Sequence, residues 1–166
     1  VNGTFVANSS SGEVTYTPLP NFFGVATANY TVKDNDGAVS NVATITVTVN
    51  AVNDPPVFDP IANQRVLKNA ATKSITITGI SAGPLENETL KFKATSKSPG
   101  IVPNPVITYT SGSTATLTFK PQPNQSGSVT IDVDLTDQGG RTFTRSFTID
   151  VIDVEFTSTP VTIAAV

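Results

Sequence analysis

An internal repeat constrains the fold more than any other feature of this 166-residue sequence. Residues 16–24 read Tyr-Thr-Pro-Leu-Pro-Asn-Phe-Phe-Gly, and residues 119–127 read Phe-Lys-Pro-Gln-Pro-Asn-Gln-Ser-Gly. The two stretches lie 103 residues apart, and the similarity continues through the apolar positions that follow each of them. Self-similarity at a fixed spacing is typical of modules arranged in tandem. The sequence therefore predicts two similar modules rather than one larger domain.

The repeat does not divide the sequence evenly, because residue 1 aligns with residue 104. Residues 1–53 are expected to form the C-terminal part of a module, without equivalents of its first three strands. Residues 54–153 are expected to form a complete module. Residues 154–166 are interpreted as the opening strand of a further module or as a donor strand. Two explanations stay open: the sequence is cut from a longer array, or other chains complete its edges.

Alternating apolar and polar residues predict an all-β fold. Leu90, Phe92 and Ala94 are expected to face inward, with Lys91 and Lys93 facing solvent. Thr and Val are abundant, and both favour strands because they are branched at Cβ. Strands with one buried and one solvated face are typical of antiparallel sandwiches. About seven strands in about 100 residues predict an immunoglobulin-like sandwich for the complete module.

Missing residue types exclude several kinds of function. The sequence has no Cys and no His, which excludes Ser–His–Asp and Cys–His catalytic sites and argues against zinc or haem. The formal net charge of −3 offers no basic stripe for nucleic acid. No apolar run is long enough to span a membrane. We therefore expect a protein that is not an enzyme, binds no nucleic acid and does not insert into membranes.

Two further stretches carry a resemblance to a known family. The stretch at 47–58, Val-Thr-Val-Asn-Ala-Val-Asn-Asp-Pro-Pro-Val-Phe, looks like a cadherin-type linker, and the Asp-containing turn at 32–37 is similar to the one before the last strand of such modules. Together with the Pro-rich repeat, they resemble the cadherin-like, immunoglobulin-like tandem repeats of large bacterial surface proteins. The resemblance implies an extracellular, cell-surface location in an adhesin-type array that often binds calcium.

Calcium is the one cofactor that this resemblance implies, because such modules bind it with clustered oxygen ligands. The residues at matching positions are Asp34, Asp36, Asn53, Asp54, Asp137 and Asp153. The set is incomplete, since Ala51 stands where the family linker has its first Asp and Phe156 aligns with Asp54. The alternative is that these carboxylates cap turns, since Asp and Asn bond backbone groups two residues further along.

Three functions are compatible with the sequence. The first is a non-catalytic spacer or adhesion module whose partners are neighbouring modules of the same protein. The second is a subunit of an extracellular filament, in which identical chains complete each other's sandwiches by strand addition. The third is a carbohydrate-binding module for surface glycans, which requires Phe22, Phe23 or Tyr109 to be exposed beside polar groups.

Overall fold

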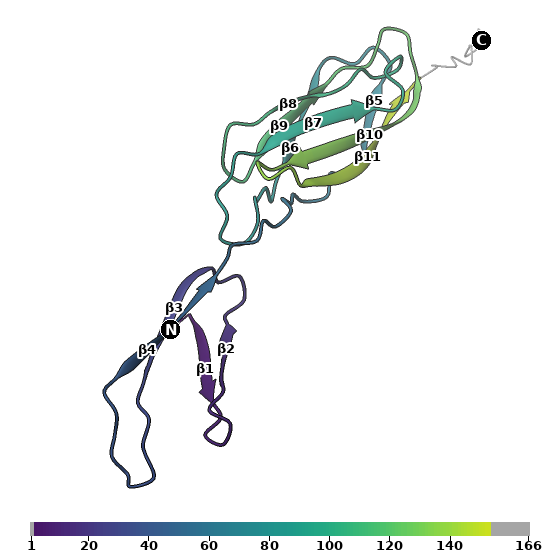
Figure 1. Ribbon diagram of the computed structural model, residues 1–166. Coiled ribbons are helices and arrows are strands. Elements are labelled where there is room, and N and C mark those ends of the chain that lie inside the picture. Colours follow the sequence, from purple (N-terminus) through teal and green to yellow (C-terminus); the bar gives the residue numbers. More distant parts are fainter. Residues whose placement is uncertain (1, 154–166) are drawn as a thin grey trace, which may run out of the picture. The chain divides into compact units, whose positions relative to one another are not determined.

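The structure is a computed structural model that describes residues 2–153 (Figure 1). The described residues form two compact units, unit 1 up to Asn53 and unit 2 from Asp54, and each is described by itself. The opening or donor strand expected at 154–166 lies outside the described residues. None of the described residues forms a helix, so the described part contains no helix able to cross a membrane.

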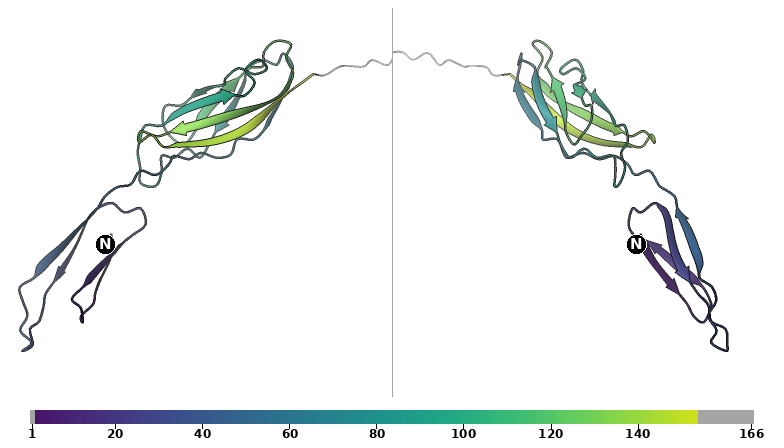
Figure 2. Two further views of the ribbon diagram at one scale, coloured as in Figure 1. Left: turned by 45° about the vertical axis from the view of Figure 1, so that its right-hand side comes forward. Right: turned by 90° about the vertical axis from the view of Figure 1, so that its left-hand side faces the viewer.

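Unit 2 is a sandwich of seven strands in two sheets, as the sequence predicts (Figures 1 and 2). The strands are β5 (Gln64–Leu67), β6 (Lys73–Ile77), β7 (Lys91–Ser96), β8 (Val106–Thr108), β9 (Ala115–Phe119), β10 (Gly127–Thr136) and β11 (Thr142–Ile152). One sheet has the order β5-β11-β10-β7 and the other the order β6-β9-β8. The all-β, sandwich prediction is confirmed.

The core of unit 2 follows from the alternation along its strands. Every second residue of β10 from Val129 to Leu135 is fully buried, while Asp132 and Asp134 between them face outward. Leu117 of β9 and Ile149 of β11 are also fully buried. Burial of apolar side chains supplies most of the stabilisation of such a domain, since about 25 cal/mol is gained for each Å² removed from water.

Aromatic side chains fill one end of this core. Phe58 packs edge-on against Phe92 and Phe143, and Phe92 packs edge-on against Tyr109. Arg145 lies over the ring of Phe143, and its Nε donates a hydrogen bond of 2.9 Å to the backbone oxygen of Phe58. These contacts fasten the start of unit 2 to its last strand.

One strand pair in unit 2 is parallel, which the alternation pattern did not predict. The short strand β5 runs parallel to the end of β11, with Gln64 opposite Ile149 and Leu67 opposite Ile152. All other strand pairs in the described residues are antiparallel. The sandwich is therefore antiparallel with one parallel edge.

Unit 1 consists of two antiparallel strand pairs. Strand β1 (Gly3–Ala7) pairs with β2 (Val14–Pro18), and β3 (Gly24–Tyr30) pairs with β4 (Ala43–Val49). By the 103-residue offset, β1, β2 and β3 correspond to β8, β9 and β10, and β4 corresponds to β11 at an offset of 102. Unit 1 thus has counterparts of the last four strands of unit 2, and equivalents of β5, β6 and β7 are missing from its described residues.

The repeated Pro-x-Pro-Asn-x-x-Gly stretch forms the same type of turn in both units, closed by a backbone hydrogen bond from Phe22 N–H to Leu19 in unit 1 and from Gln125 N–H to Gln122 in unit 2. Asn21 and Asn124 have φ angles of 60° and 61°, and Gly24 and Gly127 also have positive φ. Asn and Gly are the residues that adopt this left-handed backbone region at the lowest cost. The repeat in the sequence is therefore a repeated turn that leads into β3 and β10.

Candidate interaction surface

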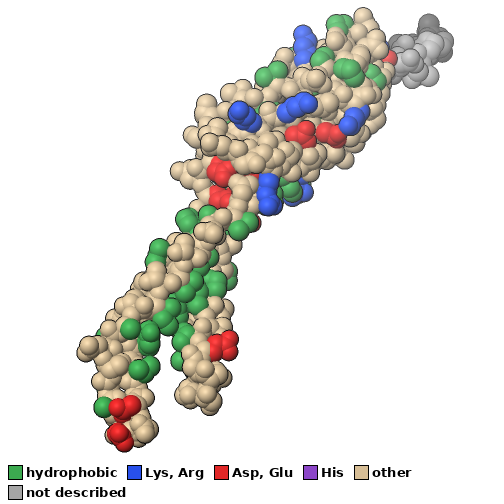
Figure 3. Space-filling view, in the orientation of Figure 1, with side chains coloured by type: hydrophobic (Ala, Val, Ile, Leu, Met, Phe, Trp, Pro, Cys, Tyr) green, Lys and Arg blue, Asp and Glu red, His purple; other side chains and the backbone are tan. Residues whose placement is uncertain are grey.

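The inward-facing side chains of unit 1 are largely uncovered. Tyr30 and Val32 are 45% and 59% exposed, whereas their counterparts Val133 and Leu135 in unit 2 are completely buried. Ala26 is the one buried apolar residue in the described part of unit 1. Figure 3 shows the hydrophobic side chains of unit 1 gathered along the space between its two hairpins. Contiguous apolar surface of this kind marks an interaction site.

Strand edges in unit 1 are open as well. In unit 2, β5, β6 and β7 pair with the outer edges of β11, β9 and β10. The corresponding edges of unit 1 lie at 47–50, 12–16 and 28–33 and have no strand beside them among the described residues. Unpaired strand edges are templates for the addition of another strand.

Two strands of unit 1, β3 and β4, are also shorter than their counterparts β10 and β11. Strand β10 continues to Thr136, where β7 pairs with it, but β3 stops at Tyr30, three residues before the equivalent position. Beyond that point, the two arms of the hairpin are joined by the isolated bridge between Lys33 and Val39 and by a hydrogen bond of 3.0 Å from Val32 N–H to Oγ of Ser40. Regular pairing between the two arms therefore ends at Tyr30 and Ala43, whereas the corresponding pairing of β10 with β11 continues to Thr136 and Thr142.

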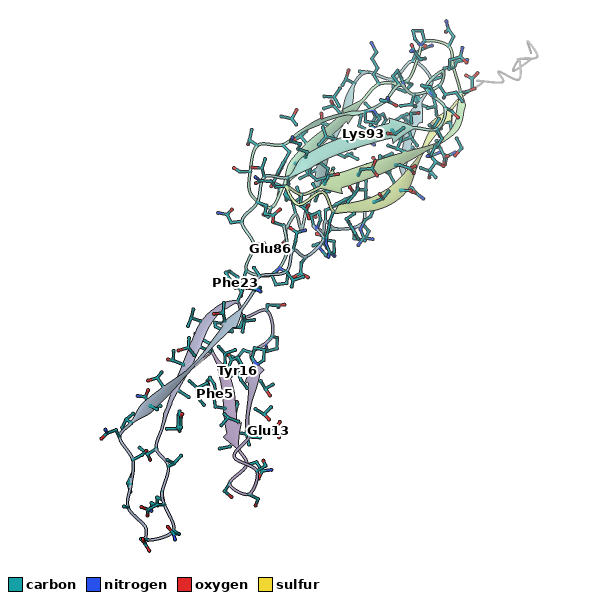
Figure 4. The ribbon with its side chains drawn as sticks, in the orientation of Figure 1. Phe5, Glu13, Tyr16, Phe23, Glu86 and Lys93 are labelled. Carbon is teal, nitrogen blue, oxygen red and sulfur yellow. The ribbon has the colours of Figure 1, made fainter. Side chains whose placement is uncertain are left out.

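Between β1, β2 and β3 lies a pocket of about 250 Å³, lined by Asn2, Gly3, Phe5, Tyr16, Val25, Ala26 and Thr27. The rings of Phe5 and Tyr16 pack at 4.5 Å (Figure 4), and the Tyr16 hydroxyl donates a hydrogen bond of 2.8 Å to the backbone oxygen of Asn2. A side chain at Gly3 would collide with the Tyr16 ring, so glycine there keeps this contact in place. The packed rings of Phe5 and Tyr16 thus form part of the wall of this pocket.

One of the predicted calcium ligands in unit 1, Asp34, caps the turn between β3 and β4, and Asp36 lies within that turn. Oδ1 of Asp34 accepts hydrogen bonds from the backbone N–H groups of Asp36 and Ala38, at 3.0 and 2.8 Å. Asn53 follows the other end of the same hairpin, beyond Val49. A seven-residue strand is about 20 Å long, so Asn53 is not brought near Asp34 or Asp36 within unit 1.

The corresponding turn of unit 2 has the same construction. Asp137 is buried between β10 and β11, and its Oδ1 accepts a hydrogen bond of 2.8 Å from Arg141 N–H. Asp153 follows the opposite end of β11 and forms an ion pair with Lys68. These two carboxylates are therefore separated by the length of the hairpin.

The structure places two acidic residues that the sequence could not place. Oε1 of Glu86 accepts a hydrogen bond of 2.8 Å from Asp54 N–H, and Oε2 of Glu88 accepts one of 3.0 Å from Gln138 N–H. Glu86 and Glu88 thus support the start of unit 2 and the β10–β11 turn. No group of three or more acidic side chains suited to a metal ion occurs among residues 2–153. Calcium binding stays a prediction.

A row of polar contacts covers the outer face of β10. Lys97 forms an ion pair with Asp132, whose Oδ1 also accepts a hydrogen bond of 2.8 Å from the Ser146 hydroxyl. The hydrogen bond from Lys97, followed by the one from Ser146, lowers the pKa of Asp132. The same hydrogen bond raises the pKa of Lys97.

Lys97→Ala is expected to raise the pKa of Asp132 toward its ordinary value, because the main stabilising contact of the carboxylate is lost. A carboxyl with a lowered pKa contributes stability above its unfolded-state pKa and loses it as the pH falls through the folded-state pKa. The variant should therefore lose less stability on acidification. The measurement is an NMR titration of the Asp132 carboxyl. Lys93→Ala, which removes the lysine opposite Asp134, is the control and should leave Asp132 unchanged.

The three aromatic residues expected for glycan binding differ in exposure. Phe23 is 48% exposed (Figure 4), whereas Phe22 is half-buried beside Gly24. Tyr109 packs against Phe92, and its hydroxyl is bonded to the backbone oxygen of Gly112. Of the three, Phe23 alone has the exposure that the glycan hypothesis requires.

Residues 1–50 match a protein family described as a bacterial Ig domain. The resemblance to immunoglobulin-like modules is thereby confirmed for this part of the chain. No curated protein matches the sequence.

Several solved structures are similar to the chain. A nucleoside hydrolase-related hypothetical protein from Saccharophagus degradans has 15% identity and a TM-score of 0.40 over 61% of this chain and 26% of its own. Domains 4 and 5 of the S-layer protein SbsC have 16% identity and a TM-score of 0.42 over 91% and 90%. PcdhgB3 EC1-4 has 14% identity and a TM-score of 0.41 over 92% and 46%. The chain thus spans about a quarter of the first structure and about half of the third. Likenesses at this level carry no argument about function.

Proposed function

On the premise that residues 1–50 are part of a bacterial immunoglobulin-like module, we propose that the chain is a non-catalytic spacer segment of a repeat array at the cell surface. The second copy of the module at 54–153 and the short Pro-containing linker between the two units support this role. The neighbouring modules of the same protein are its partners. A spacer has to keep its fold while the chain is pulled from both ends.

The observation that carries the proposal is the parallel pairing of β5 with β11. Strand β5 lies near the start of unit 2 and β11 at its end, and the two strands run side by side in the same direction. Tension on the two ends therefore slides β5 and β11 past each other along their axes. The backbone hydrogen bonds between them are loaded together and cannot open one at a time.

Contacts at both ends extend this parallel pair. Before β5, Oδ1 of Asn63 accepts a hydrogen bond of 2.9 Å from Thr148 N–H. After β5, Lys68 N–H donates one of 2.8 Å to the backbone oxygen of Ile152, and the Lys68 ammonium pairs with Asp153. Asp153, which the sequence matched to a calcium ligand, thus belongs to the contacts that resist tension between β5 and β11.

We expect unit 2, pulled by its two ends in the full chain, to unfold in one step at a force that falls in Asn63→Ala. Removing the Asn63 acceptor leaves Thr148 N–H without this hydrogen bond. Fewer hydrogen bonds then resist the applied force along the β5–β11 edge. The measurement is single-molecule force spectroscopy, in which the unfolding rate decides the outcome. Asn104→Ala, which removes a comparable side-chain bond to Ser96 N–H away from this edge, is the matched control. Gradual opening at low force, unaffected by Asn63→Ala, would contradict a load-bearing spacer.

We also propose that calcium stiffens the chain, and a separate experiment tests this. The force measurement and small-angle scattering are repeated with calcium and with chelator. A longer or stiffer chain in calcium alone supports stiffening. Identical results in both conditions would remove calcium from the proposal and leave the spacer role in place.

A further inference from the structure

One leucine of unit 2 has a backbone conformation that leucine rarely adopts. Leu85 has a φ of 61°, and all other residues with a positive φ in the described part of the chain are glycine or asparagine. The side chain of Leu85 is 70% exposed, so its packing within unit 2 does not account for this conformation. Backbone strain of this kind persists only where the surrounding structure holds it, and it is concentrated at functional sites. Leu85 is therefore a candidate for a contact with another molecule.

The loop at 82–89, which carries Leu85, is anchored to other parts of unit 2, and we call it the Leu85 loop. Oε1 of Glu86 (Figure 4) accepts a hydrogen bond of 2.8 Å from Asp54 N–H. Oε2 of Glu88 accepts one of 3.0 Å from a backbone N–H in the turn between β10 and β11. An anchored loop loses little conformational freedom when it binds a partner, which favours affinity. The loop thus presents an exposed apolar side chain in a preorganised form.

A pocket of about 210 Å³ lies elsewhere on unit 2, and we call it the Lys120 pocket. Its apolar lining comes from Pro103, Val106 and Phe119, and Lys120 lines it as well. Val106 is 64% exposed, whereas the next residue of β8, Ile107, packs against the core. Pockets for drug-sized ligands measure about 300–1,000 Å³, so this smaller pocket suits a single aliphatic side chain.

The Leu85 loop and the Lys120 pocket lie at opposite ends of β6 and β7. Thr72, which lines the pocket, directly precedes β6, and the loop follows the end of this strand. Strand β7 leads back from the loop to Ser96, whose N–H donates a hydrogen bond of 2.8 Å to Asn104 of the pocket lining. Strands of five and six residues are about 17–20 Å long. Leu85 therefore cannot enter the pocket of its own copy.

The charges beside the loop and beside the pocket are opposite in sign. Glu86 and Glu88 follow Leu85, and residues 82–89 include no Lys or Arg. Lys120 lines the pocket, and Lys73 is the first residue of the adjacent strand β6. Neither lysine forms an ion pair within residues 2–153. An acidic loop with an apolar tip is complementary to this pocket, and an anionic membrane or nucleic acid would repel it.

We propose that Leu85 of one copy of the chain inserts into the Lys120 pocket of a second copy. Glu86 and Glu88 of the first copy then lie near Lys73 and Lys120 of the second. The two surfaces differ, so the contact is heterologous, and a pair of copies keeps one unused loop and one unused pocket. Association therefore continues beyond the dimer. This contact between chains goes beyond the spacer role and does not depend on it.

Leu85→Asn tests the contact without endangering the fold, because asparagine adopts a positive φ more readily than leucine. Sedimentation velocity gives the mass of the 166-residue chain over a concentration series. We expect the unchanged chain to exceed the mass of a dimer at high concentration. Leu85→Asn should lower the association constant about tenfold or more, because one large apolar side chain is no longer buried.

The same variant should have the opposite effect on stability. At a concentration where both chains are monomeric, Leu85→Asn should raise the folding equilibrium constant of unit 2 about fivefold, because the backbone strain is relieved. Hydrogen exchange across a denaturant series measures this constant. Leu19→Asn is the matched control, since Leu19 also follows a proline and is 54% exposed. It should leave association unchanged.

A mixing experiment tests whether loop and pocket belong to the same contact. Val106→Glu damages the pocket, because it replaces an exposed apolar wall with a carboxylate beside Lys120. Neither Val106→Glu nor Leu85→Asn alone should assemble at a concentration where the unchanged chain does. An equimolar mixture of the two should form dimers and nothing larger, because each pair retains one intact loop and one intact pocket.

Four results would overturn the proposal. The first is a chain that stays monomeric at every concentration, and the second is a dimer that never grows, which would indicate a symmetric contact. The third is association that Leu85→Asn leaves unchanged or that Leu19→Asn weakens equally. The fourth is association that is lost on deletion of 154–166 but not in Leu85→Asn, which would assign the pocket to that segment.

Discussion

Leu135→Ala is expected to lower the free energy of unfolding of unit 2 by about 2–5 kcal/mol, as for other large-to-small substitutions in a packed core. Leu135 is completely buried on the central strand β10, opposite Phe92 on one side and Phe143 on the other. Neighbours held by pairing on both sides cannot move in to fill the space. The measurement is hydrogen exchange across a denaturant series, which follows peptides of unit 2 separately from those of unit 1.

Val32→Ala is the matched control, since Val32 occupies the position of Leu135 in unit 1. Its side chain is 59% exposed, so its truncation should change stability by no more than about 0.5 kcal/mol. A large effect of Val32→Ala would show that its side chain is already covered.

The repeat and the alternation predicted the parts of the fold that depend on local pattern. The inward positions of Phe92 and Ala94 in β7 were identified because apolar and polar residues alternate there. Strands β5 and β8 were missed because they have four and three residues, too few for a period to be recognised. The pairing of β5 with β11 joins residues about 85 positions apart and leaves no local signal.

The same distinction holds for the candidate site, where contacts between residues close in the sequence were predictable and contacts between distant residues were not. Turn-capping by Asp34 and Asp137 was an explicit alternative in the sequence, because Asp before a glycine turn bonds nearby backbone groups. The open face of unit 1 followed from its missing strands. The hydrogen bonds between Asn69 and Asn124 and the contact of Arg145 with Phe58 were not predictable, because they join residues far apart in the sequence.

Gly83→Ala is the second substitution with a large expected effect, a loss of about 2–5 kcal/mol from unit 2. Gly83 has a φ of +141°, which residues with a side chain rarely adopt. A Cβ at this position would overlap Oε2 of Glu86 and lie 3.0 Å from Cβ of Asp54. The carboxylate of Glu86 would have to move, and its hydrogen bond to Asp54 N–H would be lost.

Two further variants separate backbone strain from this collision. Gly140→Ala tests strain alone, because Gly140 also has a positive φ but its added Cβ would meet nothing within 4 Å. It should cost about 1–2 kcal/mol. The double variant Gly83→Ala/Glu86→Ala removes the carboxylate, so the effect of Gly83→Ala on that background should fall to the level of Gly140→Ala. The unfolding free energies of the unchanged chain, Gly83→Ala, Glu86→Ala, the double variant and Gly140→Ala all come from the exchange measurement on unit 2.

The Glu86→Ala background also tests the role of the carboxylate. Oε2 of Glu86 is buried without a hydrogen-bond partner, so the carboxylate stays in place through its bond to Asp54 and the space that glycine leaves at position 83. Because buried polar atoms without partners are costly, such a group needs a compensating interaction, and the hydrogen bond that Oε1 of Glu86 accepts from Asp54 N–H supplies one. Equal costs for Gly83→Ala and Gly140→Ala in the otherwise unchanged chain would mean that Glu86 moves aside freely. Glu86 would then not be what fixes the first residue of unit 2.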